Sequence, residues 1–296
     1  MSKTDRIIRA TGKKTPMRLV LVDITETMNI IGKKHNASAY SLKLLAETAI
    51  GSLFLSSSLK FQGTVCLKII FSGDISFVQA DTTPQGLIRA MIPQNEIQKN
   101  KHFEPALLHQ SVEVIKLNDK GKRLQESVVE AAGESIGRNI AAYLLQSEQT
   151  RSAVGIEAQI NANDPTKLDY AVGFMVEAFP DLEDRDIAIM EQVVLNLPPF
   201  LKMFNTENGF FSLNTLLDQL AGPYDIEVVK EIEPSFYCPC SKVRTLSSLS
   251  TLSNYDLEDL IADKKDHTSV QKARSPCNWP SKKHKNLQYV KELYSI

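Results

Sequence analysis

Short apolar runs separated by turn residues dominate the first 180 residues of the chain. Turns such as Ser72-Gly73-Asp74 and Asn161-Ala162-Asn163-Asp164-Pro165 separate neighbouring runs by a few residues. Strands joined this closely pair in opposite directions, since a parallel pair needs a long crossover connection. The pattern therefore predicts an antiparallel meander of strands at 65–71, 75–80 and 87–92. Further strands are expected at 6–24 (with a turn at 12–14), 112–117, 153–160 and 170–179.

Two stretches of this region have the period of a helix instead. Between Ser38 and Lys60, apolar residues recur at steps of three and four, with Lys43 and Glu47 on the opposite side. A second helix is expected from Ile136 to Gln149. Strands and helices mixed in this way predict an α+β domain built on an antiparallel sheet, covering residues 1–179.

The pattern changes at Pro180. Residues 184–203 are helical by period, although Pro198-Pro199 must kink or end that helix, and a second short helix begins at Ser212 and stops at Gly222-Pro223. An apolar strand follows at 226–232. We therefore divide the chain into an α+β core (1–179), a helical linker (180–231) and a C-terminal cysteine segment (232–296).

The composition is that of an ordinary soluble globular protein. The 296 residues are 43% hydrophobic and 23% charged, with a net charge of −1. The charged start of the chain predicts no signal peptide, and no apolar run is long enough to span a bilayer. We therefore expect a cytoplasmic protein without membrane contact, whose thiols stay reduced.

The candidate chemistry lies near the end of the chain, where three of its four cysteines fall. Cys238 and Cys240 are separated by one proline, so both sulfurs can bind one metal ion, and Cys277 follows later. Thiolate sulfur suits zinc, and the same thiols react first with oxidants when no metal is bound. A structural zinc site has four ligands, and the fourth donor here is open between His284, His267, water and none.

Other residues suggest two different functions. Gly133-Glu134-Ser135-Ile136-Gly137 matches the G-x-S-x-G motif of serine hydrolases, but Ser135 is also a preferred helix N-cap, and the antiparallel pattern disagrees with the hydrolase fold. A basic run beside the cysteines suggests a zinc-dependent nucleic-acid-binding protein as an alternative, although a solvated charged segment explains the run better. Its residues are Lys264, Lys265, Lys272, Arg274, Lys282, Lys283 and Lys285.

The remaining chemically interesting residues have simpler explanations. Cys66 alternates with apolar residues on an expected strand, and a lone cysteine in that context is usually buried filler. His35, His102 and His109 have no ligand-like spacing and are expected to be surface or hydrogen-bonded residues. No residue of the chain requires a nucleotide, and we expect no catalysis.

The chain resembles the heat shock protein 33 family, the redox-regulated 33 kDa chaperonin of bacteria, from about Asp5 to Leu293. The resemblance rests on Tyr143-Leu144-Leu145-Gln146-Ser147-Glu148-Gln149 with Ser152-Ala153-Val154-Gly155 after it, and on Phe236-Tyr237-Cys238-Pro239-Cys240-Ser241-Lys242-Val243-Arg244. It implies an ATP-independent holdase that binds unfolding proteins during oxidative stress and can form homodimers on activation. It also implies a zinc module of four cysteines, in which oxidation forms two disulfides, releases the metal and unfolds the module with the linker (180–231), exposing apolar client-binding surface.

The chain departs from the family at the metal site. Cys238 and Cys240 match the first ligand pair and Cys277 matches one ligand of the second, but Pro280 stands where its partner should be. Another alignment places the second pair near Gln271 and Arg274, with no ligand there. We therefore expect weak or substoichiometric zinc, and at most one disulfide, a small ring between Cys238 and Cys240.

Overall fold

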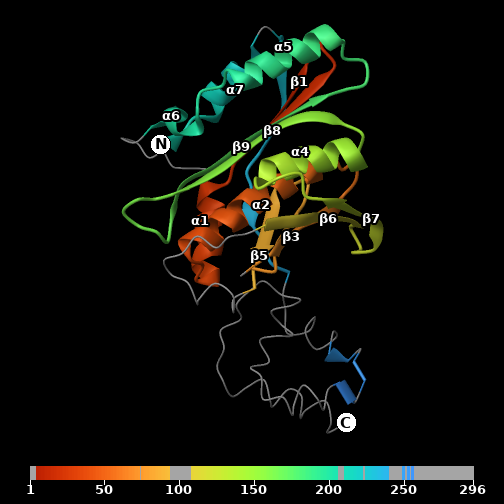
Figure 1. Ribbon diagram of the computed structural model, residues 1–296, viewed down its shortest axis with the longest axis vertical. Helices are drawn as coiled ribbons and strands as arrows, with labels where there is room; N and C mark the ends of the chain where they lie inside the picture. Colours follow the sequence, from red (N-terminus) through yellow and green to blue (C-terminus); the bar gives the residue numbers. More distant parts are fainter. Residues whose placement is uncertain are drawn as a thin grey trace. The chain divides into compact units, whose positions relative to one another are not determined.

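The computed structural model describes residues 5–73, 75–93, 108–205, 210–222, 224–239, 249–250, 252–253 and 255–256. The chain divides into two compact units, Met1–Tyr237 and Cys238–Ile296. Nearly all described residues belong to the first unit (Figure 1). The division of the sequence into core, linker and cysteine segment stays a prediction.

The strands of the first unit are β1 (Arg6–Gly12), β2 (Met17–Asp23), β3 (Gly63–Ser72), β4 (Phe77–Thr82), β5 (Leu87–Met91), β6 (Leu108–Asn118), β7 (Arg123–Glu130), β8 (Arg151–Ile160), β9 (Leu168–Ala178), β10 (Phe204–Asn205), β11 (Phe210–Phe211), β12 (Ile226–Ile232) and β13 (Ser235–Phe236). The helices are α1 (Thr25–His35), α2 (Ala39–Ser57), α4 (Ile136–Ser147), α5 (Asp184–Leu195), α6 (Phe200–Met203) and α7 (Leu213–Ala221).

Two sheets form the framework of this unit. The five-stranded sheet has the order β12-β1-β2-β9-β8, with every neighbouring pair antiparallel. The six-stranded sheet has the order β13-β5-β4-β3-β6-β7 and is antiparallel apart from β13, which runs parallel to β5. The expected α+β class, with its β3-β4-β5 meander, is confirmed.

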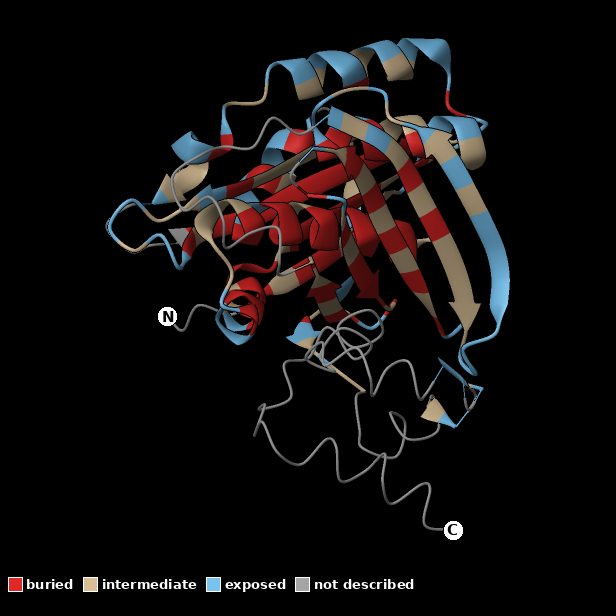
Figure 2. Ribbon diagram, turned by 60° about the horizontal axis from the view of Figure 1, so that its bottom comes forward, coloured by how far each residue is buried: buried red, intermediate tan, exposed pale blue. Residues whose placement is uncertain are grey.

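Helix α2 lies between the two sheets. Fifteen of its 19 residues are buried, because Leu45 and Ala49 pack in the same interior cluster as side chains from both sheets. The amphipathic helix expected from the sequence is therefore wrong in one respect: α2 has hardly any solvent face, and Glu47 is largely enclosed as well. Figure 2 shows this helix in red between the layers.

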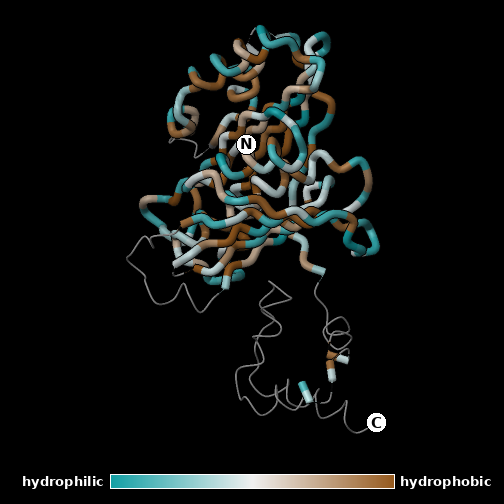
Figure 3. The backbone as a smooth tube through the Cα atoms, turned by 45° about the vertical axis from the view of Figure 1, so that its right-hand side comes forward, coloured by the Kyte–Doolittle hydropathy of each residue, from teal (hydrophilic) through white to brown (hydrophobic). Residues whose placement is uncertain are grey.

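The elements stack in four layers. The six-stranded sheet is followed by α1, α2 and α4, then by the five-stranded sheet, and finally by α5, α6 and α7 on its other face (Figure 1). Two apolar clusters result, one on each side of the five-stranded sheet. Hydrophobic segments accordingly gather in the interior of the unit (Figure 3).

Serine side chains begin three of the helices, as expected from the sequence. Ser38, Ser135 and Ser212 each accept a hydrogen bond from a backbone N–H in the first turn of α2, α4 and α7. The run at 184–203 stops being helical at Leu195, three residues before Pro198-Pro199, and resumes as the separate helix α6. Sequence patterns thus located most helices to within a few residues.

Five elements were not expected: α1, β7, β10, β11 and β13. Helix α1 carries no cap of its own at Ile24. Instead the carboxylate of Asp5, distant in sequence, accepts hydrogen bonds from the backbone N–H groups of Glu26 (2.8 Å) and Thr27 (2.6 Å). Strand β7 is polar and mostly exposed, and β13 has two residues, so neither shows an apolar pattern. Over the part of the chain that the structure describes, no helix has the length and apolar character needed to cross a bilayer.

Candidate functional site

One face of the five-stranded sheet carries a continuous apolar surface, which we call the platform. Its residues come from β1, β2 and β9 and are Ile8, Ala10, Met17, Leu19, Leu21, Tyr170, Val172, Phe174, Val176 and Ala178. Side chains alternate between the two faces of a strand, so the intervening Val20 and Val22 point into the other cluster. A strand buried on both faces has a continuous apolar run, which is why Met17–Val22 shows no polar alternation beyond Arg18.

The platform is covered by the segment 182–221, which we call the helical cover. Its buried residues are Leu182, Met190, Phe200, Phe211, Leu213, Leu216 and Leu220. Aromatic rings fill the centre of this contact: the Tyr170 ring lies 5.3 Å from that of Phe204 and 5.8 Å from that of Phe211, and the Phe174 and Phe200 rings lie 6.0 Å apart. Edge-to-face and tilted arrangements of this kind stabilise aromatic pairs.

The helical cover is packed thinly at α5. Met190 is the one buried residue among the twelve of α5, whereas Leu195 is 75% exposed. Leu201 of α6 is 59% exposed as well. The helix that crosses the top of Figure 2 is correspondingly pale blue and tan. Few buried side chains and much exposed backbone characterise segments that open locally at low free energy.

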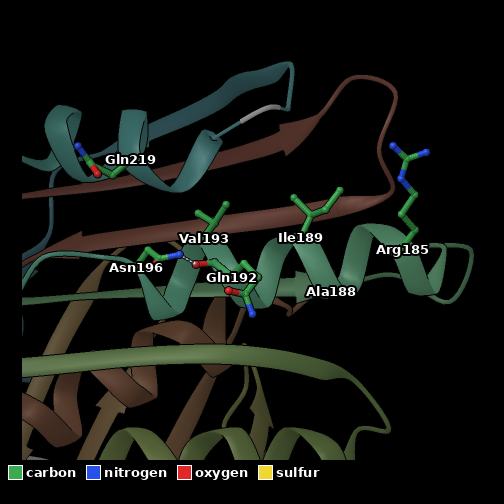
Figure 4. A pocket seen from close by; sticks show the side chains of 7 residues that line it. All are labelled: Arg185, Ala188, Ile189, Gln192, Val193, Asn196 and Gln219. Carbon is green, nitrogen blue, oxygen red and sulfur yellow. Dashed lines mark hydrogen bonds between the residues drawn. The ribbon is translucent and has the colours of Figure 1, made fainter.

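An open groove of about 600 Å³ runs between α5 and α7. It is lined by Arg185, Ala188, Ile189, Gln192, Val193, Asn196 and Gln219. Figure 4 shows Ile189 and Val193 on α5 and Gln219 on α7, with the Asn196 amide donating to the backbone oxygen of Gln192 (2.8 Å). The groove separates the two helices along part of their length.

The stretch Tyr143–Gln149 forms a buried polar network rather than a ligand site. The Tyr143 hydroxyl (3.0 Å) and the Lys116 ammonium (2.6 Å) both donate to Oε1 of Glu148. Nearby, Arg18 forms an ion pair with the buried carboxylate of Glu177, whose pKa is raised by burial although Arg18 opposes the shift. The bonds to Glu148 join the end of α4 to β6, which carries Lys116.

Cys66 lies on the half-exposed face of β3, where buried and half-buried residues alternate, so its expected place in the core is wrong. The thiol is free, and the pKa of Cys66 is raised by burial and by the neighbouring Asp81 carboxylate. A thiol with a raised pKa is a poor nucleophile and a poor metal ligand at neutral pH. Cys66 is therefore separate from the candidate chemistry of the other three cysteines.

Of the proposed zinc ligands, Cys238 is half-buried, while Cys240 and Cys277 lie outside the described residues. A sulfur in a disulfide offers no thiolate to a metal, so zinc can bind Cys238 in its reduced form alone. Within the described ranges, no group of three or more potential metal ligands comes together. The zinc site and the Cys238–Cys240 disulfide both stay predictions.

Ser135 has the structural role that its position suggested. Its Oγ accepts a hydrogen bond from the backbone N–H of Arg138 (3.1 Å) at the start of α4. A hydrolase nucleophile instead sits between a parallel strand and a helix, and the neighbouring β7 is an antiparallel edge strand. The motif therefore lacks the context that hydrolysis needs.

Both described histidines make hydrogen bonds, as expected. His35 is buried near the backbone of Ala90, and Nδ1 of His109 lies 2.7 Å from the Asn139 side-chain amide. Burial lowers the pKa of each. His102, His267, His284 and the basic residues of the nucleic-acid alternative lie outside the described residues.

The platform itself was not predicted. The sequence indicated apolar faces on the linker helices, but not the strands on which those faces rest. The available signal was the continuous apolar character of Ala171–Val176, which is typical of a strand buried on both faces.

Comparison with known proteins gives consistent results. A family model described as Hsp33 protein matches residues 5–271. A protein of Aquifex aeolicus named 33 kDa chaperonin is 30% identical over 279 residues, covering 87% of this chain and 81% of the relative. A protein of the same name from Streptococcus gordonii is 28% identical over 262 residues, covering 86% and 88%.

A solved structure shares the fold. The crystal structure of a 33 kDa chaperonin (heat shock protein 33 homolog) from Thermotoga maritima superposes with a TM-score of 0.72 at 21% identity. The alignment covers 88% of this chain and 89% of that one.

Proposed function

Because the chain belongs to the Hsp33 family, we propose that it is an ATP-independent holdase that binds unfolding proteins on the platform when the helical cover detaches. Membership in this family makes the chain a molecular chaperone. The observation that supports the holdase is the platform itself, a large apolar face covered by a segment with few buried side chains. Large apolar surfaces bind unfolded chains when they become accessible.

We propose that the C-terminal cysteines control the cover. Reduced Cys238, Cys240 and Cys277 would hold zinc through their thiolates, and zinc would supply folding free energy to the segment around them. Oxidation of the thiols of Cys238 and Cys240 by peroxide transfers two electrons and two protons to the oxidant and forms one disulfide and two water molecules. These thiols are then no longer available as ligands.

Two short strands, β12 and β13, connect the helical cover to Cys238. Tyr237, directly before Cys238, donates from its backbone N–H to the oxygen of Ile88 (3.0 Å), and β13 before it pairs over two residues. Strand β12 and the cover precede β13. Loss of order after Cys238 would therefore loosen β13 first, then β12, and finally the cover.

An aggregation assay tests the holdase. Chemically unfolded citrate synthase is diluted into the protein, reduced or treated with peroxide, and light scattering is followed. We expect suppression after peroxide treatment, and the same suppression with and without ATP. In a Cys238→Ser/Cys240→Ser variant, peroxide should no longer increase the suppression of aggregation. A Cys66→Ser variant should behave as the wild type. Undiminished aggregation in every state would contradict the holdase.

Metal content tests the proposed switch separately. We expect less than one tight zinc equivalent per reduced chain, because three cysteines leave the fourth ligand position without a thiolate. Elemental analysis with thiol counts before and after peroxide measures this directly. One tightly bound equivalent per chain would show that a fourth donor completes the site.

We further propose unfolded client proteins as the partners, a homodimer on activation and a cytoplasmic location. Light scattering coupled to size exclusion, before and after peroxide, measures the change in mass that dimer formation requires. An unchanged monomer mass in the active state would remove the homodimer from the proposal.

A further inference from the structure

Strand β12 forms one edge of the five-stranded sheet and pairs with β1 from Ile7 to Gly12. Its antiparallel register runs from Gly12 opposite Ile226 to Ile7 opposite Ile232. Beyond the strand, the Lys13 backbone N–H donates to the oxygen of Asp225 (2.9 Å). Whatever lies beside β1 thus satisfies a row of its main-chain donors and acceptors.

The side chains of β12 contribute little to this contact. Five of its seven residues are exposed, including Val229 at 66%, and the two end residues Ile226 and Ile232 are half-buried. The ion pairs Arg6–Glu231 and Lys13–Asp225 are both 3.6 Å long and exposed to solvent, so they stabilise the strand weakly. The strand is held chiefly by main-chain hydrogen bonds, which do not depend on its sequence.

Strand β1 is held from its other side much more firmly. It pairs with β2, whose side chains are nearly all buried, and Ile7, Ile8 and Ala10 of β1 are themselves buried. A register shift at Arg9/Ala10 interrupts the β1–β12 ladder but not the β1–β2 ladder. Separation of β12 therefore leaves β1 in place with one edge open.

The position of β12 in the chain links it to the cover and to the cysteines. It begins five residues after α7 ends at Ala221, and β13 with Cys238 follows it directly. Ile226 packs in the same cluster as the platform, whereas Ile232 packs in the interior cluster. Release of the cover thus removes part of the cluster in which Ile226 packs.

We propose that the edge of β1 vacated by β12 binds an extended segment of the client protein by strand addition. The proposal rests on the proposed function and specifies how the client is recognised. Main-chain pairing accepts any extended sequence, and side chains opposite Ile8 and Ala10 would lie on the platform face of the sheet. The fitting partner is therefore an unfolded chain with an apolar residue opposite Ala10, where β12 has Val228, while a charged residue is tolerated opposite Ile8, where β12 has Glu231.

A synthetic peptide with the sequence of residues 224–234 is the probe, used with the full-length protein. We expect it to bind the peroxide-activated protein, to compete with unfolded citrate synthase, and not to bind the reduced protein, whose edge is occupied. Two further peptides carry backbone N-methyl groups at alternate residues, one in each phase. The phase that blocks the bonds to β1 should bind at least about tenfold more weakly, because several hydrogen bonds are lost together.

Amide hydrogen exchange locates the contact. Residues 6–12 should exchange faster after activation and become protected again when the peptide or the client binds. Strand β7, the edge of the other sheet, is the internal control and should not change. Equal binding of the unmodified peptide and both methylated peptides, no peptide binding by the active protein, or unprotected β1 in the client complex would each overturn strand addition.

The same samples separate this proposal from the holdase itself. If the activated protein suppresses aggregation while β1 stays unprotected, strand addition is wrong and the holdase stands. If aggregation is not suppressed in any state, both proposals fall together.

Discussion

Glu47 is an ionisable residue enclosed between α2 and β8. Burial raises the pKa of its carboxyl to about 7, against the opposing effects of Lys43 and of a hydrogen bond from the Ala158 backbone. A carboxyl with a raised pKa in the folded state stabilises the fold while it is protonated. Its contribution is complete below about pH 4.5 and is lost as the pH rises towards about 7 and beyond.

Glu47→Gln should therefore stabilise the protein at neutral and alkaline pH. The difference in the free energy of unfolding should be near zero at pH 4 and grow to at most about 3 kcal/mol above pH 7, since each unit of pKa shift corresponds to about 1.4 kcal/mol. Urea unfolding at several pH values measures it. Glu233→Gln removes the same charge from an exposed position as a control, and an equal effect in both variants would contradict the assignment.

Cys66 should stay reduced when the other cysteines respond to peroxide. Its thiol is half-buried, and its pKa is raised by burial and by Asp81, so little thiolate is present to react. Alkylation by iodoacetamide at pH 8, followed by mass spectrometry of the Cys66 peptide, should be at least about tenfold slower in the folded protein than in guanidinium, because alkylation follows the thiolate fraction. Equal rates in the two conditions would show that the thiol is accessible and reactive.

At this scale the sequence was informative where a residue acts on its own neighbours. Ser135 and Ser212 each accept a hydrogen bond from the backbone N–H three residues later, so their capping role can be predicted from the neighbouring sequence. Asp5 caps α1 across 21 and 22 positions, and no local pattern predicts it. Cys66 was misplaced because alternation identifies a strand but not which of its faces meets the core.

The helical cover is the element that the proposed function requires to move. Leu216 of α7 is fully buried against the platform, so Leu216→Ala should weaken the cover by about 2–5 kcal/mol. We expect faster proteolysis within residues 184–221 and partial suppression of aggregation without peroxide. Limited proteolysis and the scattering assay measure the two effects.

Leu195→Ala is the matched control for this prediction. The Leu195 side chain is 75% exposed on α5, so the same substitution there removes little buried surface. A Leu216 variant that resists proteolysis as well as the Leu195 variant would show that the cover is not held by its apolar contacts.

For the elements, the sequence predicted existence better than environment. The helical period of residues 38–60 and the proline break at 198–199 were sufficient to place α2, α5 and α6. The burial of α2 on nearly every side was missed, because the helical period shows that a helix has an apolar face but not how many sheets it packs against. Strand β13 has two residues and depends on pairing with β5, which is information that a local pattern lacks.

Across the whole first unit, α2 is shared by both sheets. Side chains from β2, β3 and β8 meet in the cluster around it, so neither sheet has a complete apolar face without this helix. We expect both sheets to unfold in one calorimetric transition, and the thinly packed cover to unfold in a smaller one at lower temperature. Scanning calorimetry of the reduced protein checks this. Leu216→Ala should lower the midpoint temperature of the cover's transition and leave that of the sheets unchanged. A single transition lowered as a whole would contradict it.

The layer arrangement also affects how the active protein recovers its inactive state, in which the cover lies on the platform. The platform strands β1, β2 and β9 pair with one another along most of their length, and their other face packs against the cluster around α2. Release of the cover therefore leaves their register intact. Recovery then requires α5, α6 and α7 to re-form on the platform, and β12 and β13 to pair again with β1 and β5, which are already in place. Helices form in about a microsecond, whereas assembly of non-local sheets takes up to seconds, so resetting should be limited by thiol chemistry and client departure rather than by refolding.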